Sequence, residues 1–200
     1  LDVSSFVTSS VTTMYRMFYN CQNLTSLDLS SFDVSSVLSM YGMFSSCSGL
    51  TSLDVSSFVT SSVTNIDYMF ENCSGLTSLD VSSFDTSGVT SMRQMFRSCS
   101  TLTSIDVSSF DTSSVNDMFF MFYACNSLTS MVGVEDFDIT GLNSTSDLIL
   151  FITGGRMTTA QYDALLVNWE AQDVFNGLTP TFGNSEYTGG SAAATAKQAL

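Results

Sequence analysis

The stretch LDVSSFDTSGVTSMRQMFRSCSTLTS, residues 79–104, determines how this chain folds. Closely similar units of 26 residues begin at residues 1, 27, 53 and 105, so five copies follow one another in tandem. Twelve of the 26 positions are identical in all five units, among them Asp at position 2, Phe at 6, Met-Phe at 17 and 18, Cys at 21 and Leu at 24. Because one such unit is too small to bury its own apolar side chains, the repeat predicts a stack of units that share one core.

Two hydrophobic periods alternate within each unit. In LTSLDLSS, residues 24–31, leucines alternate with polar residues, which predicts a short strand with one buried face. Met14, Met17, Phe18 and Cys21 follow the i, i+3, i+4, i+7 spacing of one helical face. We therefore expect one short parallel strand and one short helical or 3₁₀ segment in each unit. A helical second element requires a curved array with its strands inside, whereas an extended one gives a nearly straight array.

The repeat also indicates how the chain is divided. Residues 1–152 are expected to form the array, with a degenerate sixth unit that begins at Met131 and lacks the cysteine. Residues 153–200 are expected to be a C-terminal capping segment. It contains a capping box, Thr158 to Gln161, followed by an amphipathic stripe of Tyr162, Leu165, Leu166 and Trp169. The abrupt ends of the sequence lead us to expect a fragment of a longer protein.

These residues resemble a known family. The frame Cys21-x-x-Leu24-x-x-Leu27-x-Leu29 is similar to the leucine-rich repeat, and MFxxCxxLTSLDVSSFDTS resembles the units of BspA-type leucine-rich repeat surface proteins of bacteria. The resemblance covers residues 1–152 and implies a leucine-rich repeat solenoid of α/β or mainly-β class. It also implies a secreted or cell-surface protein that adheres to host cells or matrix proteins. The present units differ from the commoner short form in being longer and in lacking its proline after the strand.

Composition excludes several classes of function. The 200 residues include 5 Lys and Arg against 19 Asp and Glu, a formal net charge of -14. Such an acidic chain repels phosphate backbones, so no nucleic acid partner is expected, and no segment predicts direct insertion into a membrane. The chain has no histidine, which removes Ser-His-Asp and Cys-His catalysis and histidine-ligated zinc. Carboxylate pairs lack a distinguishing context, so we do not expect an enzyme.

Two invariant polar columns run through the five units. The cysteines, one per unit, are expected to be free buried thiols, because side chains in register point the same way and disulfide geometry is demanding. The aspartates at position 2 are expected to face outward, one on each unit. Either hydrogen bonds from flanking serines, with ordinary counterions, or bound divalent cations must offset their mutual repulsion. The aspartates are Asp2, Asp28, Asp54, Asp80 and Asp106.

One further segment has the composition of a calcium loop. Asp136, Asp138, Thr140, Gly141 and Asp147 occupy positions 1, 3, 5, 6 and 12 of an EF-hand-like pattern. Position 8 is an asparagine where that pattern has an apolar residue, no helix pair is predicted around it, and the segment aligns with the sixth repeat. Calcium is therefore kept only as an alternative at this segment, and no other cofactor is expected.

Positions that differ between units are the candidates for recognition. They cluster at unit positions 15, 16, 19, 20, 22 and 23, on the side of the expected helical segment opposite its buried face. The aromatic and charged residues at these positions include Asp67, and those taken as candidates for binding are Tyr15, Arg16, Tyr19, Tyr41, Tyr68, Glu71, Arg93, Arg97, Phe119, Phe120 and Tyr123. Tyrosine and arginine are enriched in binding surfaces, whereas unconstrained positions, or positions that pack against another chain, are the competing interpretation.

The sequence thus predicts an extracellular or cell-surface binding and adhesion module. Its expected partner is a protein or glycan on another cell or in the matrix, recognised through the variable positions. The alternative hypothesis is a structural component of a self-assembling surface fibre, filament or phage appendage, whose partners are copies of the same chain.

Overall fold

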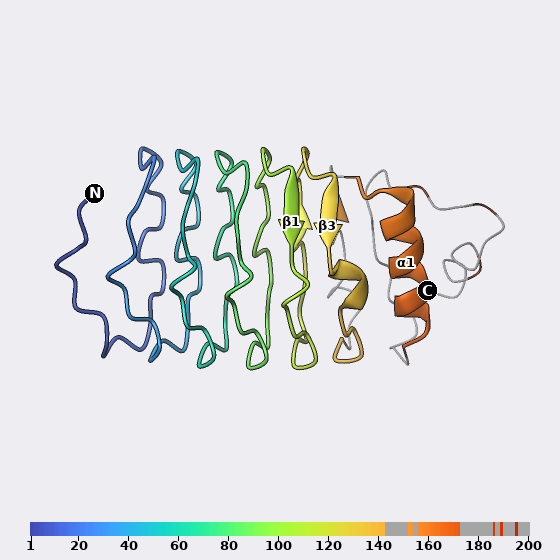
Figure 1. The fold of residues 1–200 in the computed structure, drawn as a ribbon, viewed down its shortest axis with the longest axis horizontal. Coiled ribbons are helices and arrows are strands. Elements are labelled where there is room, and N and C mark those ends of the chain that lie inside the picture. The colour runs from blue at the N-terminus through green and yellow to red at the C-terminus, as the bar shows by residue number, and fades with distance from the viewer. Residues whose placement is uncertain (143–151, 154–155, 173–185, 187–188, 190–194, 196–200) are drawn as a thin grey trace.

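Successive repeats lie side by side along one axis in the computed structural model, each forming one rung of a stack (Figure 1). The structure describes residues 1–142, 152–153 and 156–172 and the single residues 186, 189 and 195. Its elements, in chain order, are β1 (Ser104–Asp106), β2 (Phe122–Tyr123), β3 (Ser130–Val132), η1 (Val134–Asp136), β4 (Ile152–Thr153) and α1 (Thr159–Glu170). The first four rungs consist of turns and extended segments joined by single parallel bridges.

The rungs are in strict register with one another. Parallel bridges connect Thr13 to Ser39, Ser39 to Asn65, Asn65 to Ser91 and Ser91 to Asp117, each 26 residues on. In the fifth and sixth rungs the extended segments form a pair of parallel strands, with Ile105 of β1 opposite Met131 of β3. β2 pairs with β4 in the same parallel sense. A strand at the predicted position is therefore formed by β1 and β3, whereas the first four rungs have extended segments without a strand there.

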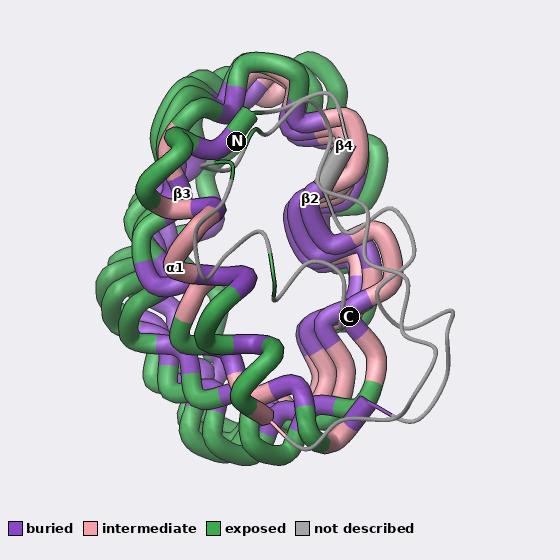
Figure 2. Tube along the Cα trace, turned by 90° about the vertical axis from the view of Figure 1, so that its right-hand side faces the viewer, coloured by how far each residue is buried: buried purple, intermediate pink, exposed green. Residues whose placement is uncertain are grey.

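The core is a set of ladders that run along the stack, with each apolar column of the repeat buried against itself. Phe18, Phe44, Phe70, Phe96 and Phe122 stack with ring centroids 5.3 to 5.7 Å apart and ring planes within 7° of parallel. Buried residues line the inside of the coil in the view along the axis (Figure 2). Stacked aromatic and methionine side chains fill such an interior well because one shape repeats at every rung.

The segment expected to be helical is instead a run of turns. Position 16 and position 20 have positive φ angles of 52° to 65° in all five rungs, as at Arg16 and Asn20. Left-handed residues interrupt a right-handed helix. The Arg16 N–H donates to the Tyr41 carbonyl of the next rung at 2.9 Å, whereas the Met17 N–H closes a turn on the Met14 carbonyl at 3.2 Å. Alternate N–H groups therefore bond between rungs, and no helical segment forms at these positions in the five rungs.

This difference also explains the shape of the stack. Hydrogen bonds join neighbouring rungs on the turn side as well as along the extended segments. Both sides of the coil therefore have nearly the same spacing, and the rungs follow an axis with little curvature (Figure 1). This is the geometry expected when the second element of the repeat is not a helix.

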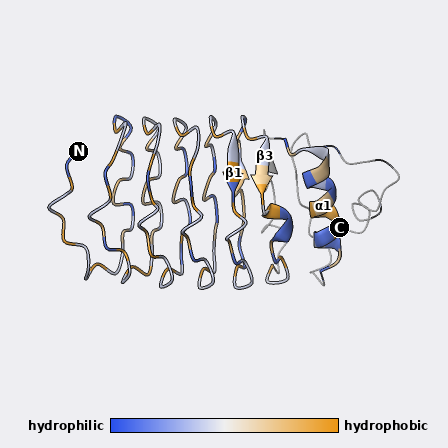
Figure 3. Ribbon diagram, in the orientation of Figure 1, coloured by the Kyte–Doolittle hydropathy of each residue, from blue (hydrophilic) through white to orange (hydrophobic). Residues whose placement is uncertain are grey.

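The C-terminal end of the stack is covered by α1. The helix begins with the predicted capping box, in which the Thr158 hydroxyl accepts from the Gln161 N–H. Its buried residues are Tyr162, Leu165, Leu166 and Trp169, which confirms the stripe expected from the sequence. The side chain of Gln172 holds the helix end against the sixth rung through Ile139 N–H at 2.7 Å and Phe137 carbonyl at 2.9 Å. Apolar and polar residues alternate along α1 as its one-sided packing requires (Figure 3).

Candidate ligand-binding ridge

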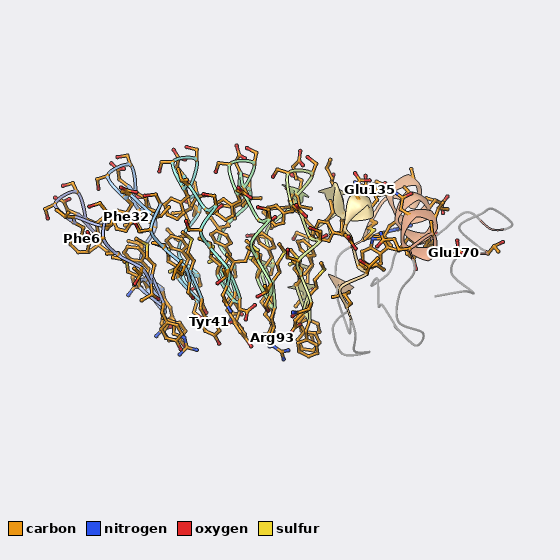
Figure 4. The ribbon with its side chains drawn as sticks, turned by 90° about the horizontal axis from the view of Figure 1, so that it is seen from below. Phe6, Phe32, Tyr41, Arg93, Glu135 and Glu170 are labelled. Carbon is orange, nitrogen blue, oxygen red and sulfur yellow. The ribbon has the colours of Figure 1, made fainter. Side chains whose placement is uncertain are left out.

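The variable positions 15, 16 and 19 come together as one row of side chains along the turn side of the stack, which we call the ridge. Tyr41 and Arg93 mark it in Figure 4, where both project from one long side of the array. Tyr15 and Tyr19 are exposed, and the ridge residues of the later rungs are half-buried because they pack on one another. The ridge comprises Tyr15, Arg16, Tyr19, Tyr41, Tyr68, Glu71, Arg93, Arg97, Phe119, Phe120 and Tyr123.

In the first three rungs the ridge is a stack of tyrosines around one arginine. The rings of Tyr15 and Tyr41 lie 5.0 Å apart at an angle of 16°, and Tyr41 and Tyr68 are also 5.0 Å apart. The Arg16 guanidinium lies 4.7 Å from the Tyr19 ring centroid and within 6 Å of Tyr15 and Tyr41. Burial raises the pKa of the Tyr41 hydroxyl, so this ring is neutral across the physiological range.

Two arginines of the fourth rung are held by carboxylates. Arg97 donates to Glu71 of the third rung at 2.8 Å, and Arg93 donates to Asp117 of the fifth rung at 3.1 Å. Arg93 also donates to the Tyr68 hydroxyl at 3.2 Å. These contacts link three successive rungs and fix the direction in which each guanidinium points.

The fifth rung ends the ridge with three aromatic rings. Phe119 and Phe120 stack at 3.8 Å, and Phe120 stacks on Tyr123 at 4.6 Å. The Arg93 guanidinium covers the Phe119 ring at 4.1 Å, and that of Arg97 lies 5.8 Å from the Tyr123 ring. The aromatic surface of Phe119 and Tyr123 is thus partly covered by the arginines of the preceding rung.

Asp67 is at the variable position 15, but its side chain lies beneath the ridge instead of on it. It is buried, and its carboxylate accepts from the Ser91 hydroxyl and from the Arg93 N–H at 2.9 Å. Burial raises its pKa. Asp117 was missed by the sequence analysis, because it occupies position 13, where the other units have Thr, Ser or Asn. The change to a carboxylate at that position was the available signal.

Beside the ridge runs a shallow trough of about 410 Å³ that crosses the rungs. It is lined by the residues at positions 20 and 22, chiefly serines together with Gln22, Asn72 and Asn126. Its lining carries no formal charge, so it offers hydroxyl and amide groups to whatever contacts the ridge.

The aspartates of position 2 face outward and are satisfied locally. The Asp54 carboxylate accepts from the Ser56 hydroxyl at 2.6 Å and from the Ser56 N–H at 2.9 Å, and the equivalent backbone bond recurs in all five rungs. The Ser56 side chain and then its N–H lower the pKa of Asp54, while the neighbouring Asp80 raises it. The local hydrogen bonds therefore outweigh the repulsion between rungs, as the serine interpretation requires.

The five cysteines are free thiols, as predicted. Cys47, Cys73, Cys99 and Cys125 are buried, and each donates to the carbonyl of a phenylalanine in the preceding rung at 3.0 to 3.2 Å. Burial raises the pKa of Cys47 to about 11 and that of Cys125 to about 12. These thiols are therefore protonated hydrogen-bond donors rather than nucleophiles at neutral pH.

Only part of the candidate calcium segment lies within the described residues. Asp138 accepts from the Thr140 N–H and hydroxyl at 2.8 and 2.6 Å, the same turn that the repeats form. Asp136 ends η1, while Asp147 lies outside the described residues. Among the residues that are described, no three His, Cys, Asp or Glu side chains are grouped as metal ligands. The calcium alternative stays a prediction.

Comparison with known proteins identifies a family. The family model described as "Mycoplasma protein of unknown function, DUF285" matches the chain twice, over residues 1–79 and 52–150. The chain belongs to this family. The two overlapping matches to the DUF285 model span the five rungs, as expected for a repeat. No curated protein and no solved structure matches the chain.

The DUF285 family description gives no activity, so the function of this member must be argued from its own surface. In the parts of the chain that the structure describes, no helix is long and apolar enough to cross a bilayer.

Proposed function

We propose that this chain is an extracellular or cell-surface binding module of BspA-like, leucine-rich repeat type. It recognises a protein or glycan on another cell or in the matrix, and the ridge is its contact surface. Catalysis has no part in this proposal.

The observation that carries the proposal is the combination of backbone and side chain at position 16. This position has a positive φ angle in every rung, which favours glycine, yet only Gly42 is glycine. The other rungs place Arg16, Tyr68, Gln94 and Phe120 there. A large side chain in the left-handed region costs about 1 kcal/mol relative to glycine. Positions free of any role are expected to accumulate glycine or asparagine, so the retained side chains favour a role in recognition.

The contacts of the ridge support the same proposal. Ion pairs and ring stacking hold Arg93, Arg97 and the aromatic rings in place before any ligand arrives. A surface that is ordered in advance loses less side-chain entropy on binding. Aromatic and arginine side chains are also the types that contribute most at protein interfaces.

A screen of the 200-residue chain against arrays of purified matrix proteins and of glycans tests the proposal. We expect a bound target, and we expect Tyr41→Ala combined with Arg93→Ala to weaken its binding at least tenfold. The matched control is Leu38→Ser combined with Val59→Ser, which alters exposed apolar residues outside the ridge and should leave binding unchanged. Binding that survives the ridge substitutions but is lost in the control would reject the ridge.

The alternative, a self-assembling fibre, is favoured by exposed apolar residues outside the ridge, among them Val7 and Val59 at position 7. Sedimentation of the same variants separates the two proposals. Assembly that grows with concentration, survives the ridge substitutions and is lost in Leu38→Ser with Val59→Ser supports the fibre.

A further inference from the structure

The four arginines described by the structure differ in how their charge is compensated. Arg93 pairs with Asp117, Arg97 with Glu71, and Arg156 with Glu186. Arg16 has no carboxylate within salt-bridge distance among the described residues, although the chain carries 19 acidic residues. Its guanidinium is exposed and lies between the rings of three tyrosines. The ridge therefore has a compensated part in rungs three to five and an uncompensated part in rungs one and two.

The surroundings of Arg16 supply hydroxyl donors, and no described carboxylate lies within salt-bridge distance of its guanidinium. The hydroxyls of Tyr15, Tyr19 and Tyr41 make no hydrogen bond to other described residues, so they remain available to a ligand. The π faces around the guanidinium restrict its motion without neutralising it. A planar fork of N–H donors held in this way matches a carboxylate, which can accept two parallel hydrogen bonds.

The orientation of the rings distinguishes two sources of that carboxylate. The Tyr41 ring packs against the rings of Tyr15 and Tyr68, and the Arg16 guanidinium covers one face of the Tyr19 ring. A sugar ring packs its C–H face on an open aromatic face, and these contacts take up part of the aromatic surface that such packing needs. Ring edges carry partial positive charge and instead favour carboxylate and carbonyl oxygens.

From these observations we infer that Arg16, Tyr15, Tyr19 and Tyr41 form a subsite for a carboxylate side chain in an acidic segment of a partner protein. This inference rests on the proposed binding function and names the chemistry of one end of the ridge. The uncompensated end binds the acidic group, and the compensated end contributes packing and hydrogen bonds.

The subsite is tested by titrating the 200-residue chain with the N-acetylated, C-amidated peptide Gly-Ser-Glu-Glu-Ser-Gly. Binding is monitored through the NMR signal of the Arg16 Nε–H and by calorimetry. We expect a shift of that signal, and binding at least tenfold tighter than that of the peptide with Gln in place of Glu. Added salt should weaken binding, because the subsite is exposed.

Arg16→Gly is the most informative variant. Gly42 occupies the same position in the next rung, so glycine fits the φ angle of 52° and the fold is expected to persist. The variant should lose the glutamate preference by about tenfold or more, and Arg16→Lys should retain part of it. The control Arg156→Gln, which removes one positive charge away from the ridge, should retain it fully.

Each other outcome overturns the inference in a distinct way. Equal affinity for the Glu and Gln peptides, no binding of the Glu peptide, or unchanged binding by Arg16→Gly rejects a carboxylate subsite. Binding of digalacturonate that is tighter than that of the Glu peptide and depends on Arg16 rejects the protein source in favour of an acidic glycan. A target from the arrays that requires Tyr41 and Arg93, with no response to the Glu peptide, leaves the proposed function standing and rejects only this subsite.

Discussion

Single residues in this chain are constrained by the backbone angle that their place in the rung imposes. Gly42 has a φ angle of 58°, and a Cβ added there would lie 3.2 Å from Cγ of Arg16. Gly88, at position 10, has an ordinary φ angle, and an added Cβ would be 3.5 Å from the nearest atom, the Val63 carbonyl oxygen. Of these two glycines of the repeat array, only Gly42 therefore has a backbone angle that favours glycine.

Replacing these two glycines by alanine should have opposite effects on stability. Gly42→Ala is expected to lower the free energy of unfolding by about 1 kcal/mol, because alanine is strained at positive φ. Gly88→Ala is expected to raise it by about 0.4–1 kcal/mol, because alanine restricts the unfolded chain without strain in the folded one. Urea denaturation of both variants measures the difference. Equal effects at the two positions would mean that the left-handed angle at position 16 does not contribute.

The outward aspartates give a prediction for pH dependence at the same scale. The Ser56 hydroxyl is the first cause of the lowered pKa of Asp54, so Ser56→Ala should raise that pKa toward its ordinary value. Since the folded-state pKa lies below the unfolded one, the turn contributes stability above the unfolded pKa and loses it as pH falls through the folded pKa. NMR titration of the Asp54 carboxyl measures the shift, and Ser57→Ala is the control. A pKa that does not move would assign the effect to the Ser56 N–H alone.

At the scale of elements, the pattern of buried side chains could be predicted from the sequence more accurately than the backbone conformation. Met40, Met43, Phe44 and Cys47 have the spacing of a helical face and are all buried, but they lie on consecutive turns. Hydrophobic spacing does not distinguish these structures, because the deciding hydrogen bonds go to the next rung. The sequence predicted the ridge as a set of variable positions. Its ion pairs and the hydrogen bonds of Asp67 join residues that are 24 to 26 positions apart in the chain, so they depend on how the rungs stack.

Threonine at position 8 joins neighbouring rungs through its side-chain hydroxyl group. The buried Thr86 hydroxyl donates to the Asp111 carbonyl at 2.9 Å and accepts from the Asp111 N–H at 2.8 Å. Thr86→Val keeps the shape but leaves that N–H and carbonyl without the hydroxyl, so we expect a loss of about 1–3 kcal/mol in unfolding free energy. Thr90→Val makes the same change at an exposed site and should cost less than about 0.5 kcal/mol. Equal losses in urea denaturation would contradict a role for the buried bond.

At the scale of the whole molecule, the stack is a series of nearly equal rungs in which each contacts mainly its neighbours. Such arrays have stabilities that sum over rungs and the interfaces between them, so one end can open while the rest stays folded. The first rung already differs from the others, because Phe6 and Met17 are exposed where their equivalents in later rungs are buried, and Cys21 is only half-buried. At the opposite end α1 packs against the sixth rung. Opening is therefore expected to begin at the first rung of this 200-residue chain.

The cysteine column reports that opening rung by rung. In native conditions at pH 8, iodoacetamide should label Cys21 first, then Cys47, and Cys125 last or together with Cys99. Cys47 needs only the first rung to separate, whereas Cys73 and Cys99 need two and three rungs to separate, and burial raises the pKa of all four buried thiols. Mass spectrometry of peptides from timed samples gives each rate, and labelling in urea corrects for the intrinsic reactivity of each thiol. Equal rates for the four buried thiols would show that the stack opens as one cooperative unit, whereas a rate that falls steadily from Cys47 to Cys99 would give the free energy of each interface between rungs.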